Sequence, residues 1–160
     1  MNKKQVIDKL QLEEHVEGGY FRRTYESSMQ ISVKQQPRHL LTSIYYLLSD
    51  DSPIGHFHQN HSDIIHYYHL GGVLKYYLIS PQGELKIVLL GHDMEQGQQL
   101  QLTVPGGYWK ASMLINGEFG LISEAVAPGF KYSDMHLANN DQMHSDFPDL
   151  FEQIKHLIKS

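Results

Sequence analysis

The sequence predicts an all-β protein, a jelly-roll β-barrel with short helices at its two ends. Three observations support this prediction. Roughly eight to ten short runs of strand-forming residues follow one another, with turn residues between them. Helical patterns occur only over residues 2–11 and about 147–158. No repeat, low-complexity tract or linker divides the chain, which favours one antiparallel architecture over an α/β fold.

The composition narrows the class of protein. A chain of 160 residues with 41% hydrophobic residues fits one domain over residues 1–160, with a barrel core at about residues 18–138. The net charge of -5 and the scattered Lys and Arg argue against a nucleic-acid partner. The absence of cysteine excludes disulfides and thiolate chemistry. Since no run resembles a membrane span or a signal-peptide core, we expect a cytoplasmic protein without a membrane partner.

The first third of the chain predicts a helix followed by strands. Residues 2–11 have apolar residues on one helical face, with Asn2 as the N-cap. Residues 20–25 are rich in β-formers and predict a strand. Residues 28–38 are polar and weakly patterned, which predicts a loop. Residues 39–49 form a dense apolar run whose length is typical of a strand.

The second half predicts two hairpins and a final helix. Residues 73–80 and 84–90 are strand-like and flank a Ser-Pro-Gln-Gly turn, so we expect a hairpin. Residues 100–104 alternate Leu or Val with polar residues, as a half-buried strand does. Asn116-Gly117 predicts a second hairpin, because this dipeptide favours the positive φ angles of a tight turn. Residues 147–158 carry the apolar side chains of one helical face.

Residues 55–72 hold five of the eleven histidines and form the predicted site. His56 and His58 are two apart, so on a strand both side chains leave the same face. Asp63 follows a polar turn, where it either orients the imidazole of His58 or caps the turn. His66 either reaches a ligand or is a structural strand residue bonded to the backbone.

Several motifs occur in a fixed order along the chain and together resemble a known family. They are EGGYFRRTY (17–25), SIYYLL (43–48), the set His58, Asp63 and Gly71, LLG (89–91), VPGGYW (104–109) and VAPGFKYSDMHLA (126–138). Over about residues 13–138 the chain resembles the cupin-like family DUF985, also called cupin-5. The resemblance implies a small cupin β-barrel that binds a small molecule and forms a homodimer. The wider superfamily includes metal-dependent oxygenases, sugar isomerases, metal-free epimerases and binding proteins, so the reaction stays open.

The resemblance also implies a test for a metal. A metal-binding cupin has an H-x-H pair, then an acidic residue, then a histidine after the second motif. His56 and His58 fit the pair and Asp63 fits the acidic position by spacing, but Lys110 takes the last position. A protonated lysine does not ligate a metal ion and would repel it. We therefore expect no cofactor; a divalent transition metal, if bound, would use His56, His58 and Asp63.

Other candidate ligand-binding residues lie in the signature stretches. Tyr20 and Arg22 share a strand face, where Arg22 either pairs with an anionic group or lies near a sheet edge. Glu124 either points into the barrel as a carboxylate or lies at its rim. Three aromatic residues are further candidates: Tyr45, Tyr68 and Trp109. They either wall a pocket or fill the core.

Two classes of function are open at this point, and whether the protein is an enzyme is part of the question. The first is a metal-independent isomerase, epimerase or lyase acting on a sugar-like or anionic metabolite. His58 would be its general base and Asp63 would orient that base. Tyr68 or Tyr20 would donate a proton, and Arg22 or Lys110 would hold negative charge on the substrate. The second is a binding module with the same pocket and no turnover, which senses or stores a metabolite. A metal-dependent cupin enzyme is a further alternative.

Overall fold

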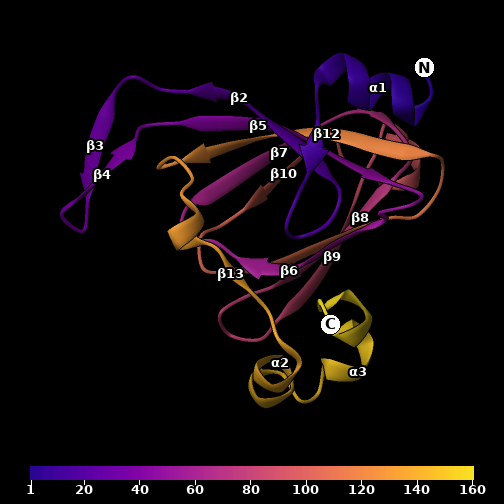
Figure 1. The fold of residues 1–160 in the computed structure, drawn as a ribbon. Coiled ribbons are helices and arrows are strands. Elements are labelled where there is room, and N and C mark those ends of the chain that lie inside the picture. The colour runs from indigo at the N-terminus through magenta and orange to yellow at the C-terminus, as the bar shows by residue number, and fades with distance from the viewer.

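The computed structural model describes residues 1–160 as two antiparallel β-sheets packed face to face (Figure 1). In spatial order, the six-stranded sheet contains β1 (Glu13–Glu14), β2 (Tyr20–Glu26), β5 (Thr42–Ser49), β12 (Phe119–Ala127), β7 (Asp63–Gly71) and β10 (Gln101–Val104). The five-stranded sheet contains β13 (His136–Leu137), β6 (Ile54–Gln59), β11 (Trp109–Leu114), β8 (Leu74–Ile79) and β9 (Leu85–Leu90). The prediction of an all-β jelly roll with short helices is confirmed.

Helices cover the outer side of each sheet (Figure 1). The helix α1 (Lys3–Leu10) packs on the six-stranded sheet, and α2 (Asn140–Asp146) and α3 (Phe151–Ile154) pack on the five-stranded sheet. Three single 3-10 turns complete the chain: η1 (Met94–Gln96), η2 (Tyr132–Asp134) and η3 (Lys155–Leu157). Apolar residues therefore fill three clusters, one between the sheets and one under the helices on each side.

The alternation of side chains along each strand decides which residues face the interior. On β5, Tyr46 and Leu48 belong to the inner cluster, while Leu47 packs under α1. On β6, Phe57 packs under the C-terminal helices. Its neighbour His58 therefore points inward. The expectation that His56 shares this face is wrong, because a β-bulge shifts the register of β6 between its pairings with Lys110 and Ser112, and the His56 ring turns to the backbone of Glu17 instead.

The N-terminal helix agrees with the sequence-based expectation, whereas the C-terminal helical region differs from it. The helix α1 begins as predicted, because the side chain of Asn2 accepts a hydrogen bond from the backbone N–H of Gln5 at 2.9 Å. The single helix expected over residues 147–158 is wrong. The structure has α2, then α3, then η3, and Pro148 falls between the first two, where its missing N–H cannot interrupt a helix.

The loop expected over residues 28–38 is instead a two-stranded arm, formed by β3 (Gln30–Val33) and β4 (Gln36–His39). The arm reverses at Lys34 and Gln35, which both have positive φ, and it extends away from the body (Figure 1). Pro37 is tolerated because β4 pairs with β3 alone, so one of its edges is free.

The hairpin expected at Asn116-Gly117 is also wrong. This turn connects β11 to β12, which lie in different sheets, so it carries the chain from one layer to the other. The side chain of Asn116 accepts a hydrogen bond from the backbone N–H of Val73 at 2.7 Å, which fixes the crossing. By contrast, the hairpin predicted for residues 73–90 is confirmed, since β8 and β9 pair along their length.

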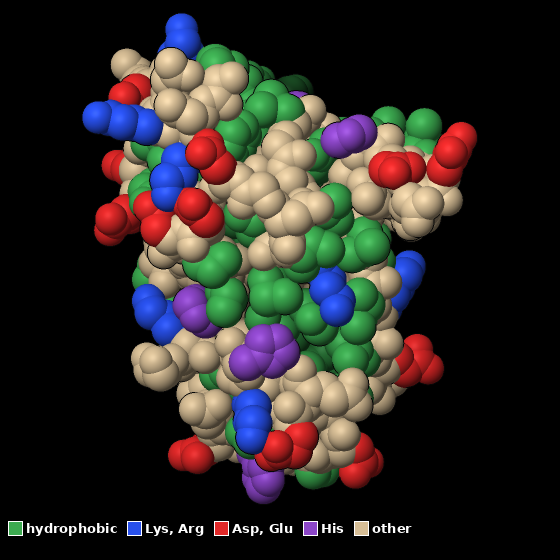
Figure 2. All heavy atoms as spheres, turned by 90° about the vertical axis from the view of Figure 1, so that its right-hand side faces the viewer, with side chains coloured by type: hydrophobic (Ala, Val, Ile, Leu, Met, Phe, Trp, Pro, Cys, Tyr) green, Lys and Arg blue, Asp and Glu red, His purple; other side chains and the backbone are tan.

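The molecular surface has no uniform charge on the face seen in Figure 2. Hydrophobic side chains form a central strip there, and acidic and basic side chains are interspersed around it. No helix has the length and apolar character needed to cross a membrane.

Candidate functional site

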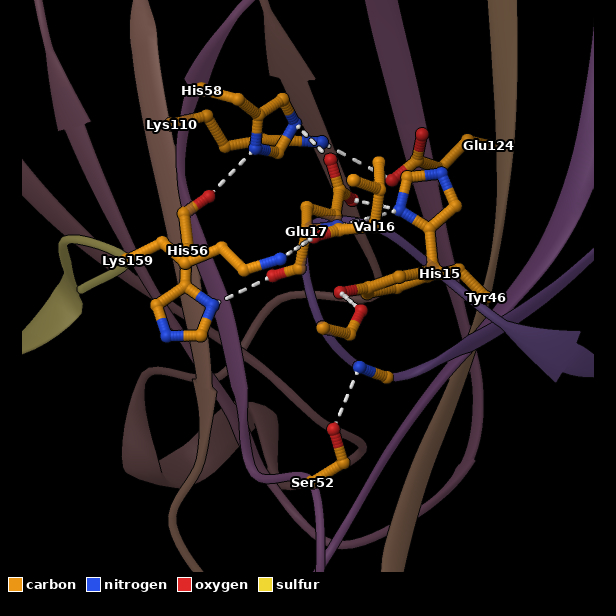
Figure 3. Close-up of polar contacts among 12 residues, drawn as sticks. His15, Val16, Glu17, Tyr46, Ser52, His56, His58, Lys110, Glu124 and Lys159 are labelled. Carbon is orange, nitrogen blue, oxygen red and sulfur yellow. Dashed lines mark hydrogen bonds and ion pairs between the residues drawn. The ribbon is translucent and has the colours of Figure 1, made fainter. Parts of the chain in front are cut away.

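Four polar side chains from the two sheets meet inside the sandwich. Lys110 on β11 is the cross-strand neighbour of His58 on β6, and Glu124 on β12 is the cross-strand neighbour of His66 on β7. All four residues are at most 6% exposed. Lys110 Nζ lies 3.2 Å from Glu124 Oε1, so one ion pair joins the two sheets (Figure 3).

The fifth member of the site is Glu17, in the turn between β1 and β2. His56 holds this turn through two hydrogen bonds to Glu17 O, from its backbone N–H at 2.7 Å and from Nδ1 at 2.9 Å. Gly18 has φ of +103°, and a Cβ there would lie 2.0 Å from Ile54 O, so only glycine fits. The turn thereby fixes the Glu17 carboxylate inside the sandwich (Figure 3).

Both ring nitrogens of His58 are engaged. Nδ1 lies 2.8 Å from His56 O, and since a carbonyl oxygen only accepts, Nδ1 carries a hydrogen. Nε2 lies 2.9 Å from Glu17 Oε2, so one proton is shared between these two atoms. Burial acts to raise the pKa of Glu17, but the charge and hydrogen bond of His58 outweigh it and lower the pKa.

Lys110, Glu124 and His66 form a second buried network. Lys110 Nζ donates to Glu124 Oε1 at 3.2 Å and to His66 Nε2 at 3.4 Å. Because Nε2 accepts, the ring proton of His66 is on Nδ1, which lies 3.2 Å from Glu124 Oε1. Burial and then the charge of Lys110 lower the pKa of His66, which keeps this ring neutral.

Glu124 is held as a carboxylate by the same network. Burial acts to raise the pKa of Glu124, but Lys110 and His66 outweigh it and hold the pKa well below its usual range. Two nearby phenols remain protonated, since burial raises the pKa values of Tyr46 and Tyr76.

The carboxylates of Glu17 and Glu124 line a cavity of about 460 Å³. Its remaining polar interior residues are His15, Thr42 and Asn60. The apolar part of its wall is formed by Phe21, Ile44, Ile64, Val126, Phe130, Tyr132 and Met135. His58 and Lys110 do not line the cavity, so the cations lie behind the carboxylates rather than between them and a ligand.

His15 lies next to the carboxylate of Glu17 in Figure 3, with its Nδ1 3.7 Å from Glu17 Oε1. Its Nδ1 accepts a hydrogen bond from the backbone N–H of Glu17 at 3.2 Å, which places the ring proton on Nε2. Burial lowers the pKa of His15 more strongly than the carboxylates raise it, so the ring is neutral. Asn60 Oδ1 is buried and has no hydrogen-bond partner.

The structure brings some of the predicted site residues together. His58, His66, Lys110 and Glu124 form the buried network, and His56 holds the backbone of the Glu17 turn.

The other predicted residues lie elsewhere. Asp63 does not contact His58; it is exposed and accepts a hydrogen bond from the backbone N–H of Gly106 at 2.8 Å, as a turn-capping residue does.

The remaining predicted residues belong to the apolar clusters or the sheet edge. Tyr68 donates to Gly71 O at 2.6 Å within the inner core, and Arg22 donates to Gln11. Tyr20 and Tyr45 pack on the cluster under α1, and Trp109 packs under the C-terminal helices.

Of the 15 residues that line the cavity, only Glu124 was a predicted site residue. The polar interior residues that were missed are His15, Glu17, Thr42 and Asn60. Glu17 opens the EGGYFRRTY motif, and an acidic residue directly before two glycines is the signal that could have identified it. Asn60 follows the strand β6 in the polar stretch that reads as a turn.

The donors present do not fit a metal ion. His58 uses both ring nitrogens in hydrogen bonds, and Asp63 lies outside the cavity, so the expected set His56, His58 and Asp63 does not converge. The ammonium group of Lys110 contacts Glu124 and His66, where it would repel a cation. No three His, Asp or Glu side chains are grouped as a metal would need.

The two-layer sandwich with a polar interior is the architecture of the cupin superfamily. Residues 4–138 match the family model Cupin_5, described as "Cupin superfamily (DUF985)", and the chain belongs to this family.

Relatives match over nearly the whole chain. The uncharacterized protein YML079W of Saccharomyces cerevisiae is 38% identical over 96% of this chain and 79% of its own length. A hypothetical protein from Leishmania major has a solved structure with a TM-score of 0.94 and 30% identity, covering 100% of both chains. Protein SO0799 from Shewanella oneidensis has a TM-score of 0.91 and 34% identity, covering 99% of this chain and 98% of its own.

Proposed function

We propose that this protein binds a polar small molecule in the cavity and catalyses a proton transfer on it without a metal, as an isomerase, epimerase or lyase. One observation carries the proposal. Glu17 lines the cavity, while its Oε2 shares a proton with the buried His58 at 2.9 Å. A carboxylate that reaches the ligand and is backed by a proton donor can take up and return a proton during a reaction.

The geometry favours Glu17, rather than His58, as the group that contacts the substrate. His58 has no free ring nitrogen and does not line the cavity, so it acts as a positioning residue through Glu17. Glu124 provides a second carboxylate in the same cavity, with Lys110 behind it. This assignment differs from the expectation that His58 is the base and Asp63 its partner.

A non-catalytic binding module is the second candidate, and one observation favours it. The pKa values of Glu17 and Glu124 are both lowered, since the cations behind them outweigh burial. A carboxylate with a lowered pKa is a weak base, which suits hydrogen bonding to a ligand better than abstraction of a proton from carbon.

Solvent exchange tests the proposal. The protein is incubated in D2O with a panel of aldoses, ketoses, hydroxy acids and keto acids, and loss of C–H signals is followed by proton NMR. We expect exchange in at least one compound, and Glu17→Gln to slow it by about 100-fold or more, as loss of an acid–base group does. The control Glu152→Gln changes a carboxylate whose side chain is 78% exposed, and should leave the rate unchanged.

Three outcomes would contradict the proposal in different ways. A compound that raises the melting temperature but never exchanges would favour the binding module. Exchange that stops when a chelator is added would point to a metal. Undiminished exchange in Glu17→Gln would remove Glu17 from the reaction.

A further inference from the structure

The cavity presents hydrogen-bond acceptors that lack donors. Glu17 Oε1 accepts no hydrogen bond from the protein, and the unprotonated Nδ1 of His15 lies 3.7 Å away. Glu124 uses Oε1 for both Lys110 and His66, which leaves Oε2 without a hydrogen bond. Asn60 is only 7% exposed, and its Oδ1 has no partner. Carboxylate oxygens that line a cavity and accept no hydrogen bond from the protein favour a ligand that donates hydrogen bonds.

The charges around the cavity already balance. His58 neutralises Glu17 and Lys110 neutralises Glu124. At the edge of the cavity Arg23 pairs with Glu26 at 2.7 Å. The remaining edge charges, on Lys131 and Glu13, form no ion pair but are opposite in sign, and Lys131 donates to Pro37 O at 2.8 Å. An anionic ligand in the interior of the cavity would face the carboxylates of Glu17 and Glu124, while the nearest unpaired cation, Lys131, lies at the edge. A cationic ligand would add a buried charge without a counter-ion.

The rest of the wall is apolar, with side chains such as Phe21, Ile44 and Val126 opposite the polar interior residues. We infer that the ligand is an uncharged, hydroxyl-rich molecule, a monosaccharide or related polyol, whose hydroxyls donate to Glu17 and Glu124 and contact the Asn60 amide. Its C–H faces would pack on the apolar wall, and the cavity volume is in the range of small-molecule sites. This inference rests on the proposed function for the cavity being the ligand site, and it narrows the ligand class to neutral molecules.

Matched sugars test the ligand class. Sets of neutral hexoses, the corresponding uronates and the corresponding 2-amino-2-deoxy sugars are screened at pH 7 by saturation-transfer NMR, and binders are titrated by calorimetry. The best neutral hexose is expected to bind at least about tenfold more tightly than its uronate and its amino analogue, since each charged analogue adds an unpaired charge. A uronate or an amino sugar as the best ligand would overturn the inference, and so would a panel in which no neutral member binds.

A variant locates the binding. Asn60→Leu replaces an amide that lines the cavity with an apolar side chain of similar volume and is expected to weaken the best neutral sugar by about tenfold, the effect of one hydrogen bond. The control Asn140→Leu, at an exposed position of α2, should leave the affinity unchanged. Unchanged affinity in Asn60→Leu, with a melting temperature close to that of the wild type, would overturn the assigned contact.

The two proposals fail separately. If an anionic compound binds and exchanges deuterium in a way that depends on Glu17, the ligand class is wrong and proton transfer stands. If a neutral sugar binds in the cavity and never exchanges, the ligand class stands and catalysis is wrong.

Discussion

Lys110 shows how one side chain sets the state of several others. It is only 4% exposed, and its ammonium group contacts Glu124 and His66. A buried ion is tolerated where a counter-ion and hydrogen bonds replace water. Lys110 thereby keeps Glu124 ionised and fixes the tautomer of His66.

Loss of this lysine tests the pairing. Lys110→Met is expected to lower the free energy of unfolding by about 3–5 kcal/mol, because it leaves the Glu124 carboxylate without its cation. The double variant Lys110→Met/Glu124→Leu should recover most of the loss, since both charges are then gone. Urea denaturation of the wild type, Lys110→Met and the double variant measures the three free energies of unfolding.

A surface pair provides the control for that cycle. Lys155 pairs with Glu152 at 2.7 Å on the surface, and Lys155→Met should cost about 1 kcal/mol or less. A similarly small cost for Lys110→Met would contradict the pairing.

The inward direction of several site residues can be predicted from the alternation of side chains along the strands. His58 and Lys110 face inward because their neighbours Phe57 and Trp109 pack under the helices. Glu17 could not be placed in this way, since it lies in a turn whose path depends on contacts with His56 and Ile54. Asp63 was misplaced because spacing along the chain cannot distinguish a capping carboxylate from one that contacts a distant histidine.

At the scale of elements, the turn between β1 and β2 determines whether Glu17 enters the site. Its two glycines have positive φ, and each lies against the backbone of a neighbouring strand. Further hydrogen bonds from Ser52 and Tyr46 hold the turn in place, with Ser52 Oγ accepting from Gly19 N at 2.8 Å and Tyr46 donating to Gly18 O at 2.8 Å.

A substitution in this turn should therefore affect both stability and the site. Gly18→Ala would place Cβ 2.0 Å from Ile54 O, so the turn must shift and carry Glu17 with it. We expect a loss of unfolding free energy well above the roughly 1 kcal/mol that positive φ alone costs alanine, together with loss of ligand binding. Thermal denaturation and a binding assay measure the two effects.

The chain offers a matched control for the turn variant. Gly97 has φ of +76° and nothing within 4 Å of the Cβ position, so Gly97→Ala should show the φ cost alone and bind ligand normally. Equal effects of Gly18→Ala and Gly97→Ala would show that the contact with Ile54 does not matter.

The position of each strand was easier to predict from the sequence than the neighbour with which it pairs in the sheet. Local pattern identifies β8 and β9 and their turn, because both strands are adjacent in sequence and in the sheet. The turn at Asn116-Gly117 fixes a reversal of the chain, but tertiary packing decides that β12 joins the other sheet. The positive φ values at Lys34 and Gln35, in residues that are not glycine, hid the reversal of the arm.

At the scale of the whole molecule, the buried network couples stability to pH. The pKa values of His15 and His66 are lowered from 6.5, chiefly by burial, so their neutral rings favour the folded state above pH 6.5 and this stabilisation is lost below it. The pKa values of Glu17 and Glu124 are lowered from 4.5, because their cations outweigh burial. Their stabilisation is present above pH 4.5 and is lost as the pH falls through the folded-state values.

Denaturation at several pH values checks these signs. The free energy of unfolding is expected to fall between pH 7.5 and pH 5.5 and to fall further towards pH 3.5, because all four groups act in the same direction. In Glu124→Gln the decline below pH 4.5 should be shallower. Stability that rises on acidification would contradict the assigned protonation states.

The ion pair that joins the two sheets also bears on how the protein is made. Glu17, His58, Lys110 and Glu124 come from segments spread over most of the chain. During synthesis Lys110 leaves the ribosome before Glu124, so the lysine cannot be buried with its counter-ion until β12 has emerged. Contacts between such distant segments are typical of slow folding, and the cavity with its paired charges is therefore a late product of folding.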